Sequence, residues 1–169
     1  MNTESLLISQ FKTLAAYHDW ANARLLRELE PVTDEHYFAP AGLFFHSIHG
    51  TLNHMLLGDR LWYGRFAGVL ETFSSLAQEV EARRGELARQ LAARGGLWAS
   101  LIDNTPADAM ADTLRYTATS GRPSAVPWTG ALTHAFNHAT HHRGQISAVM
   151  TRYGYTCPEL DLIYFLHQA

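Results

Sequence analysis

The first part of the chain has apolar residues at alternating three- and four-residue steps, the spacing of an amphipathic helix. This pattern predicts a helix over residues 5–29, which Pro31 would end. His18 lies on the apolar seam, so we expect its side chain to point inward. The residues that form the seam are Leu7, Phe11, Leu14, Ala21 and Leu25.

A second helix is predicted over residues 42–66, between Pro40 and Gly68. It is apolar nearly all round, which indicates burial on several sides. A third helix is predicted over residues 75–101, and Ser75 with Gln78 three positions later would form its capping box.

The fourth helix is predicted over residues 129–154, with Gly154 as a left-handed C-terminal residue. Before it, residues 102–127 contain two short extended pieces around Ser120 and Gly121, which predict a small hairpin. The apolar tail LDLIYFLHQ would dock back onto the helices. The sequence therefore predicts an all-α protein, a four-helix bundle with a small hairpin between helices 3 and 4, in a single domain over residues 1–169.

Composition and charge narrow the function classes. The chain is 47% hydrophobic and 17% charged, with a net charge of −3 and no basic stripe, which argues against nucleic acid as a partner. No apolar run is long enough to cross a membrane, and the start of the chain does not resemble a signal peptide, so we expect a cytoplasmic protein without membrane contact. Cys157 is the only cysteine and is expected to be a bystander.

The predicted fourth helix carries four histidines within the stretch HAFNHATHH. At about 100° per residue, His142 falls inside the buried arc and His138 at its edge, whereas His134 and His141 lie toward solvent. His134 and His142 are about 12 Å apart along the axis, too far to share one metal ion. The pair His138 and His142 has the i,i+4 spacing of two imidazoles that converge on a metal. A polar rim or a hydrogen-bonded core feature would also explain the cluster.

A third ligand would come from a facing helix, and the second helix offers His46, His49 and His54. The helical wheel does not decide among them, although His54 has small neighbours that would leave space for an ion. Asp59 falls among apolar positions, where a carboxylate needs a partner. It either pairs with an Arg or an indole N–H, or accepts a hydrogen bond from a ligand imidazole.

Four motifs together resemble the DinB/YfiT-like superfamily, in particular the DinB proteins named for induction by DNA damage. The resemblance covers residues 11–167. It implies an up-down-down-up four-helix bundle, usually a homodimer, with a divalent metal held by one histidine of helix 2 and two of helix 4. Placed on the matching positions of this sequence, the metal ligands that the resemblance implies are His54, His138 and His142. The motifs are YHDWANARLL, GLFFHSIHGTLNHMLLGDRLW, NHATHHRGQ and LDLIYFL.

One position departs from the family pattern, because relatives often have Asn where this chain has His18. His18 would be an extra metal ligand or proton carrier, or a core histidine satisfied by a backbone carbonyl.

Three neutral nitrogens leave a coordination position open, as in catalytic metal sites. Nickel or zinc fits such a site, as do iron and manganese. The resemblance implies a small-molecule substrate and a metal-dependent S-transferase that uses a low-molecular-weight thiol. Alternatives are a metal-dependent hydrolase, for which Asp59 or Asp19 would be the base, and a non-catalytic metal-binding stress-response protein. Vestigial ligands on a structural bundle are a further alternative, whereas the missing carboxylate set argues against a di-iron site.

Overall fold

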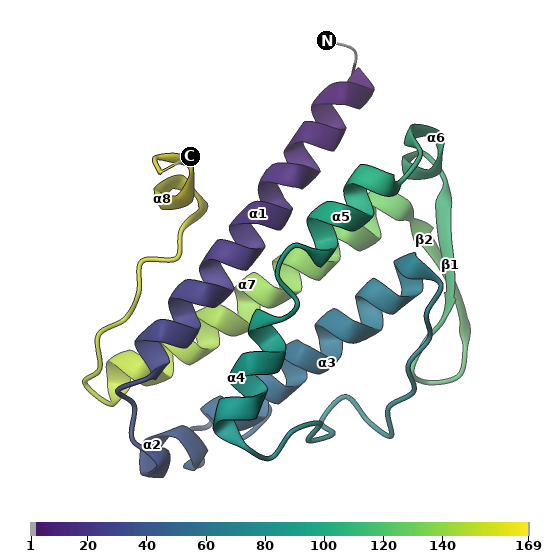
Figure 1. The fold of residues 1–169 in the computed structure, drawn as a ribbon. Helices are drawn as coiled ribbons and strands as arrows, with labels where there is room; N and C mark the ends of the chain where they lie inside the picture. The colour runs from purple at the N-terminus through teal and green to yellow at the C-terminus, as the bar shows by residue number, and fades with distance from the viewer. Residues whose placement is uncertain (1–2, 169) are drawn as a thin grey trace.

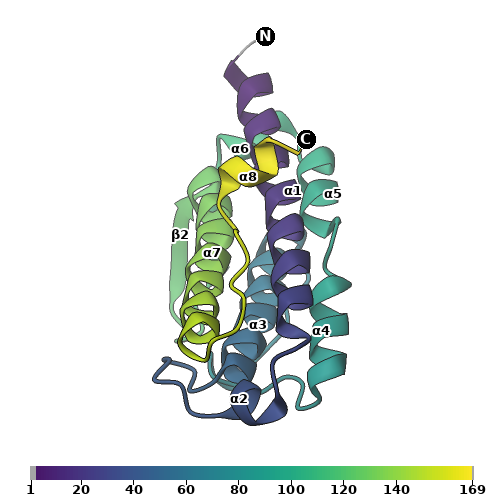
Figure 2. The same ribbon diagram turned by 90° about the vertical axis from the view of Figure 1, so that its left-hand side faces the viewer.

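Three long helices lie side by side along the molecule, with a row of two shorter helices beside them (Figures 1 and 2). The computed structural model describes residues 3–168. The protein is mostly helical and has one small two-stranded sheet. The long helices are α1 (Thr3–Leu29), α3 (Ile48–Ala67) and α7 (Trp128–Arg152), and the row consists of α4 (Arg84–Ala92) and α5 (Leu97–Asn104). Shorter elements are α2 (Asp34–Phe38), α6 (Ala107–Met110), β1 (Thr113–Thr117), β2 (Pro123–Pro127) and α8 (Leu162–Leu166).

Helix α1 confirms the first predicted helix. Phe11, Ala21 and Leu25 of its apolar seam are buried, and so is His18. Leu7 is an exception, with 38% of its surface exposed. The seam therefore faces the interior from Phe11 onward.

Helix α3 starts later than predicted, at Ile48 rather than near residue 42. Ser47 is the N-cap, and its hydroxyl accepts a hydrogen bond from the N–H of Gly50. His46 has a φ of 68°, a left-handed conformation that a helix cannot continue through. The predicted end is confirmed, because Gly68 is a left-handed C-cap.

The third predicted helix, over residues 75–101, is wrong. Residues 75–83 form no helix, and the remaining part is divided into α4 and α5 around Gly96, which has a φ of 78°. The expected capping box does not form, because Gln78 Oε1 accepts hydrogen bonds from the backbone N–H and hydroxyl of Ser74. Asn53 of α3 forms hydrogen bonds with the backbone of residues 80 and 81, which ties this non-helical segment to α3.

The fourth helix and the hairpin are confirmed. Helix α7 ends at Arg152, and Gly154 has the expected left-handed conformation, with a φ of 80°. Strands β1 and β2 are antiparallel, with Leu114 opposite Val126. Gly121 also has a positive φ, of 80°, within the connecting turn.

The C-terminal tail docks on α1, as expected. Phe165 of α8 packs against the rings of Tyr17 and Trp20. Upstream of α8, the Tyr17 hydroxyl donates a hydrogen bond to the carbonyl of Leu160. Among the helices of residues 3–168, none combines the length and apolar character needed to cross a membrane.

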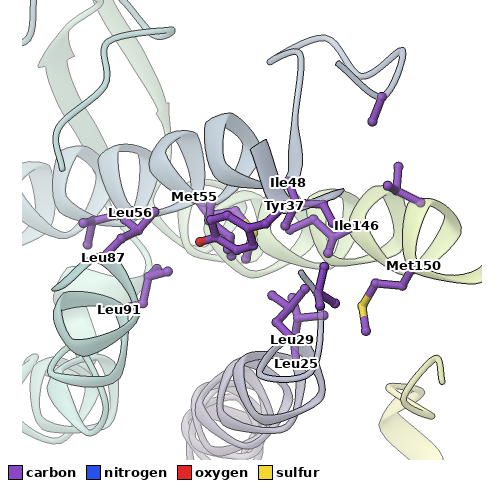
Figure 3. Close-up of a cluster of buried hydrophobic side chains, with 14 residues drawn as sticks. Leu25, Leu29, Tyr37, Ile48, Met55, Leu56, Leu87, Leu91, Ile146 and Met150 are labelled. Carbon is purple, nitrogen blue, oxygen red and sulfur yellow. The ribbon is translucent and has the colours of Figure 1, made fainter. Parts of the chain in front are cut away.

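Two apolar clusters fill the interior. The first lies toward α2 and draws side chains from α1, α2, α3, α4 and α7 (Figure 3). The second lies toward the hairpin and includes Trp98 and Phe136. Met55 and Leu91 of the first cluster and Trp98 of the second line one small cavity, so the cavity lies where the two clusters meet.

Candidate metal centre

Three histidine side chains from two helices converge on one point. His54 belongs to α3, and His138 and His142 belong to α7. Nε2 of His138 lies 3.0 Å from Nε2 of His54 and 3.1 Å from Nε2 of His142. One ligand atom from each of the three residues lies within 4.8 Å of the others. These are the three histidines that the family resemblance implied, and the structure brings them together.

The close packing of α3 and α7 places the three rings. His138 and His142 are one turn apart on α7, so they project side by side. Gly58, one turn after His54 on α3, lets His138 approach, because a methyl group at position 58 would lie 3.1 Å from Cε1 of His138. The helical spacing and one missing side chain therefore set the geometry of the cluster.

Two of the three rings are oriented by acceptors on their other nitrogen. Nδ1 of His54 lies 2.8 Å from the carbonyl oxygen of Leu76, and Nδ1 of His142 lies 2.8 Å from Oε1 of Gln145. Oxygen acceptors of this kind require a proton on Nδ1. The proton on Nδ1 leaves the lone pair of Nε2 directed at the common point.

The donor set fits a divalent cation. Neutral imidazoles that face one another with lone pairs repel, and one proton on His138 could satisfy only one of the two neighbours. In a tetrahedral zinc site with Zn–N bonds of about 2.0–2.1 Å, ligand nitrogens are about 3.3 Å apart. The observed separations of 3.0 and 3.1 Å are close to this value. A cation at the common point would satisfy all three lone pairs.

Burial keeps the three rings neutral. Burial, with smaller contributions from the neighbouring His142 and His54, lowers the pKa of His138 to about 3. Burial also lowers the pKa of His142, to about 4, and that of His54. Because the neutral form of histidine is the one that binds metal, the cluster is ready for a cation at neutral pH.

A phenylalanine closes one flank of the cluster. The ring of Phe45 stacks on His54 with a centroid distance of 3.7 Å and an interplanar angle of 15°. It also meets His142 edge-on at 5.6 Å. Phe45 is buried, so this contact removes water from one side of the site.

The other histidines of the two helices lie outside the cluster. His134 and His141 are exposed, as predicted from the helical wheel. His46 is also exposed, in the loop before α3. His49 is buried, and its Nε2 accepts a hydrogen bond from the side-chain amide of Asn53, at 3.1 Å.

His18 and Asp59 do not belong to the group of residues that could hold an ion. Nε2 of His18 accepts a hydrogen bond from the side-chain amide of Asn22. The prediction that a backbone carbonyl satisfies His18 is therefore wrong. The Asp59 side chain, only 8% exposed, accepts hydrogen bonds from Arg94 and from Nε1 of Trp98. The prediction that Asp59 pairs with an Arg or an indole N–H is confirmed, because it pairs with both Arg94 and Trp98.

Three functional contacts were not predicted. Leu76 acts through its carbonyl, which no side-chain pattern reveals, and it lies in a segment predicted to be helical. Gln145 is three residues after His142, a spacing that places both on one helical face and was an available signal. Phe45 is part of a quoted motif but lies before the helix, where no periodicity fixes its direction.

Comparisons with known proteins agree with this geometry. A model of the DinB family matches residues 1–169. Protein DinB of Bacillus subtilis (strain 168) is 27% identical over 164 residues, covering 90% of this chain and 91% of that protein. The crystal structure of a DinB-like protein from Bacillus cereus ATCC 10987 has a TM-score of 0.58 and 18% identity, and the match covers 83% of this chain and 90% of that chain. The structural likeness concerns the fold, whereas the family model spans the whole sequence, so the chain belongs to the DinB family.

Proposed function

We propose that this protein binds a divalent metal ion through His54, His138 and His142 and is an S-transferase for a low-molecular-weight thiol. The convergence of three Nε2 atoms carries the proposal, because those of His54 and His142 both lie within hydrogen-bond distance of that of His138. Nickel or zinc is the expected ion, and iron or manganese would also be accepted by nitrogen ligands.

The site residues have three tasks in this proposal. The three imidazoles hold the ion, and as three ligands they leave at least one coordination position for a substrate. A bound cation favours the thiolate over the thiol and so supplies a nucleophile at neutral pH. Leu76 and Gln145 fix the direction of two rings, and Phe45 excludes water from one flank.

The carboxylates support transfer over hydrolysis. A metal-dependent hydrolase usually needs a free carboxylate as general base, and the sequence offered Asp59 and Asp19. Asp59 is bound by Arg94 and Trp98, and Oδ2 of Asp19 accepts a hydrogen bond from the N–H of Gly96 at 2.7 Å. Both carboxylates therefore already accept hydrogen bonds from protein donors, and neither belongs to the group of described residues that could hold an ion.

The proposal includes the scaffold. We infer an up-down-down-up four-helix bundle in a single domain, in which α4 and α5 together replace the third helix. The packing of α1 against α4, α5 and α7, and of α3 against α4 and α7, supports this arrangement.

The test compares two single substitutions on α7. His138→Ala removes a ligand, whereas His134→Ala removes an exposed histidine one turn earlier. We expect the first to weaken metal binding by more than about 100-fold, beyond the usual loss when an outer partner is removed, and the second to leave it unchanged. Calorimetry on tag-free protein, with elemental analysis, measures this. Equal affinity for His138→Ala and the parent would falsify the metal site.

Activity is tested separately with metal-loaded parent protein, a panel of small thiols and an electrophile. Metal-dependent conjugation is the expected result, and it should be lost in His138→Ala. Cleavage of ester or amide panels without added thiol would instead identify a hydrolase. Absence of turnover with every loaded metal would favour a non-catalytic metal-binding protein.

A further inference from the structure

A small cavity lies next to the histidine cluster, on the interior side. Its volume is about 20 Å³, and it is bordered by α1, α3, α4, α5 and α7. His138 and Gly58 form one part of its wall, and His18, Asp59 and Arg94 form another. A metal-facing histidine and a buried ion pair therefore border the same space.

His138 differs from the other two histidines of the cluster. Its Nε2 points at Nε2 of His54 and of His142, and when Nε2 of His138 binds the proposed ion, the proton of the neutral ring is on Nδ1. Within residues 3–168, this Nδ1 has no hydrogen-bond acceptor from the protein, whereas His54 and His142 each have one. A methyl group at position 58 would lie 3.5 Å from Nδ1 of His138, so this nitrogen faces the space that Gly58 leaves open.

The part of the wall formed by His18, Asp59 and Arg94 offers both a hydrogen-bond acceptor and hydrogen-bond donors. The Asp59 carboxylate accepts one hydrogen bond from Trp98 and one from Nε of Arg94, and a carboxylate has about four acceptor positions. Nη2 of Arg94 is buried and has no partner among the described residues. The carboxylate can therefore accept a further bond, and the guanidinium can donate one.

A second buried donor comes from His18. Arg143 donates to Oδ1 of Asn22, which fixes the amide so that its Nδ2 donates to Nε2 of His18. The proton of the neutral His18 ring is therefore on Nδ1, which is buried and has no partner among the described residues. Buried N–H groups without acceptors are costly, and ordered water commonly satisfies such groups.

We propose that the cavity holds one water molecule that bridges Nδ1 of His138 and the carboxylate of Asp59, and that in metal-loaded protein this water accepts a hydrogen bond from Nδ1 and donates one to the carboxylate. A cavity of this size accommodates one water, which needs two to four polar partners. Arg94, whose Nη2 is buried without a partner among the described residues, is a further donor at this cavity. Asp59 and Arg94 are then positioning residues for a metal ligand, a role that rests on the proposed metal binding.

The water is tested directly by a high-resolution crystal structure of the parent protein, both metal-free and metal-loaded. We expect one ordered water within hydrogen-bond distance of Nδ1 of His138 and of an Asp59 oxygen. A dry cavity, or a protein group on Nδ1 of His138, would overturn the inference. The position of the water does not depend on the ion, because in metal-free protein the same water can donate to both Nδ1 of His138 and the Asp59 carboxylate. A parent that binds no metal would therefore refute the proposed function, while the metal-free crystals still decide the water.

The positioning role is tested by chelator competition with zinc. Asp59→Asn keeps the shape of the side chain but removes its charge, and we expect zinc affinity to fall about 10- to 100-fold, as is usual for outer partners of ligand histidines. Arg60→Gln is the matched control, because it breaks the ion pair with Glu71 at the adjacent position of α3 and should not change affinity. Parent-like affinity in folded Asp59→Asn protein would contradict the role, and if that variant does not fold, the crystallographic water decides.

Discussion

The partner of each ring nitrogen determines what a histidine of this chain can do. His18 and His49 are both buried, and each has an asparagine four residues later whose amide donates to Nε2. That nitrogen is then no longer free for a metal. His138 instead has His142 four residues later. Histidine with asparagine at i+4 thus indicates a structural residue in this chain. Histidine with histidine at i+4 indicates a ligand pair only where both side chains face inward, as for His138 and His142 but not for the exposed His134.

His18 makes the metal-free protein sensitive to acid. Burial lowers its pKa from 6.5 to about 3, with smaller contributions from Arg143 and Arg94. Below pH 6.5 the unfolded chain binds a proton at this residue that the folded chain does not. Stability due to His18 is therefore present above pH 6.5 and is lost as the pH falls toward 3, by about 1.4 kcal/mol for each pH unit.

The substitution His18→Asn removes this titration and leaves an amide that can accept from Asn22. We expect the free energy of unfolding to fall less steeply between pH 6 and pH 4 than in the parent. Urea denaturation of metal-free protein at several pH values measures the slope. An unchanged slope would show that His18 is protonated in the folded state over this range.

At the scale of elements, one side chain of α3 organises the segment before α4. Asn53 is buried, and its oxygen accepts from the N–H groups of Val80 and Glu81 while its nitrogen donates to the Glu81 carbonyl. The same segment supplies the Leu76 carbonyl to His54. The segment that is not helical is therefore the one that orients a ring of the histidine cluster.

We expect Asn53→Ala to lower the free energy of unfolding by about 2–3 kcal/mol, because several hydrogen bonds worth about 1 kcal/mol each are lost. The segment between α3 and α4 should also become more susceptible to proteolysis. Ser74→Ala, in the same segment but exposed, is the control and should have a small effect. If Asn53→Ala and the parent had equal stability and equal susceptibility to proteolysis, Asn53 would not organise this segment.

The sequence predicted the structure well where apolar and polar side chains recur with the spacing of a helix. The apolar seam of α1, the histidine face of α7 and the turn at Gly121 were predictable because helical spacing and glycine geometry are local properties. Residues 75–83 have helical composition, but hydrogen bonds to the distant Asn53 tie part of the segment to α3 in a non-helical conformation. The histidine of α3 was identified through the family resemblance, because the wheel left His46, His49 and His54 open.

At the scale of the whole molecule, the apolar surface of α3 is explained within one chain. A helix that is apolar nearly all round also favours a homodimer, because a second chain could cover one of its sides. Helix α3 packs against α2, α4, α5, α7 and β1, and residues 51–58 are all buried. The family resemblance is therefore the remaining support for a homodimer.

Sedimentation at several concentrations should show a dimer, and a monomer throughout would refute this proposal.

Metal should also raise the melting temperature. An ion that binds only the folded chain stabilises it by about 2.7 kcal/mol when its concentration is 100 times the dissociation constant. We expect thermal unfolding to shift upward with added zinc and downward with a chelator in the parent. Neither shift should occur in His138→Ala, and an equal shift in that variant would place the ion elsewhere.

His54 and His138 are separated by 84 positions in the chain. An ion shared by them would close a long loop and act as a removable crosslink between α3 and α7. Loss of the ion would free both helices at their point of contact, so a cell short of the metal would lose this protein to degradation sooner. The amount of protein would then follow the metal supply, whether or not the reaction itself is needed.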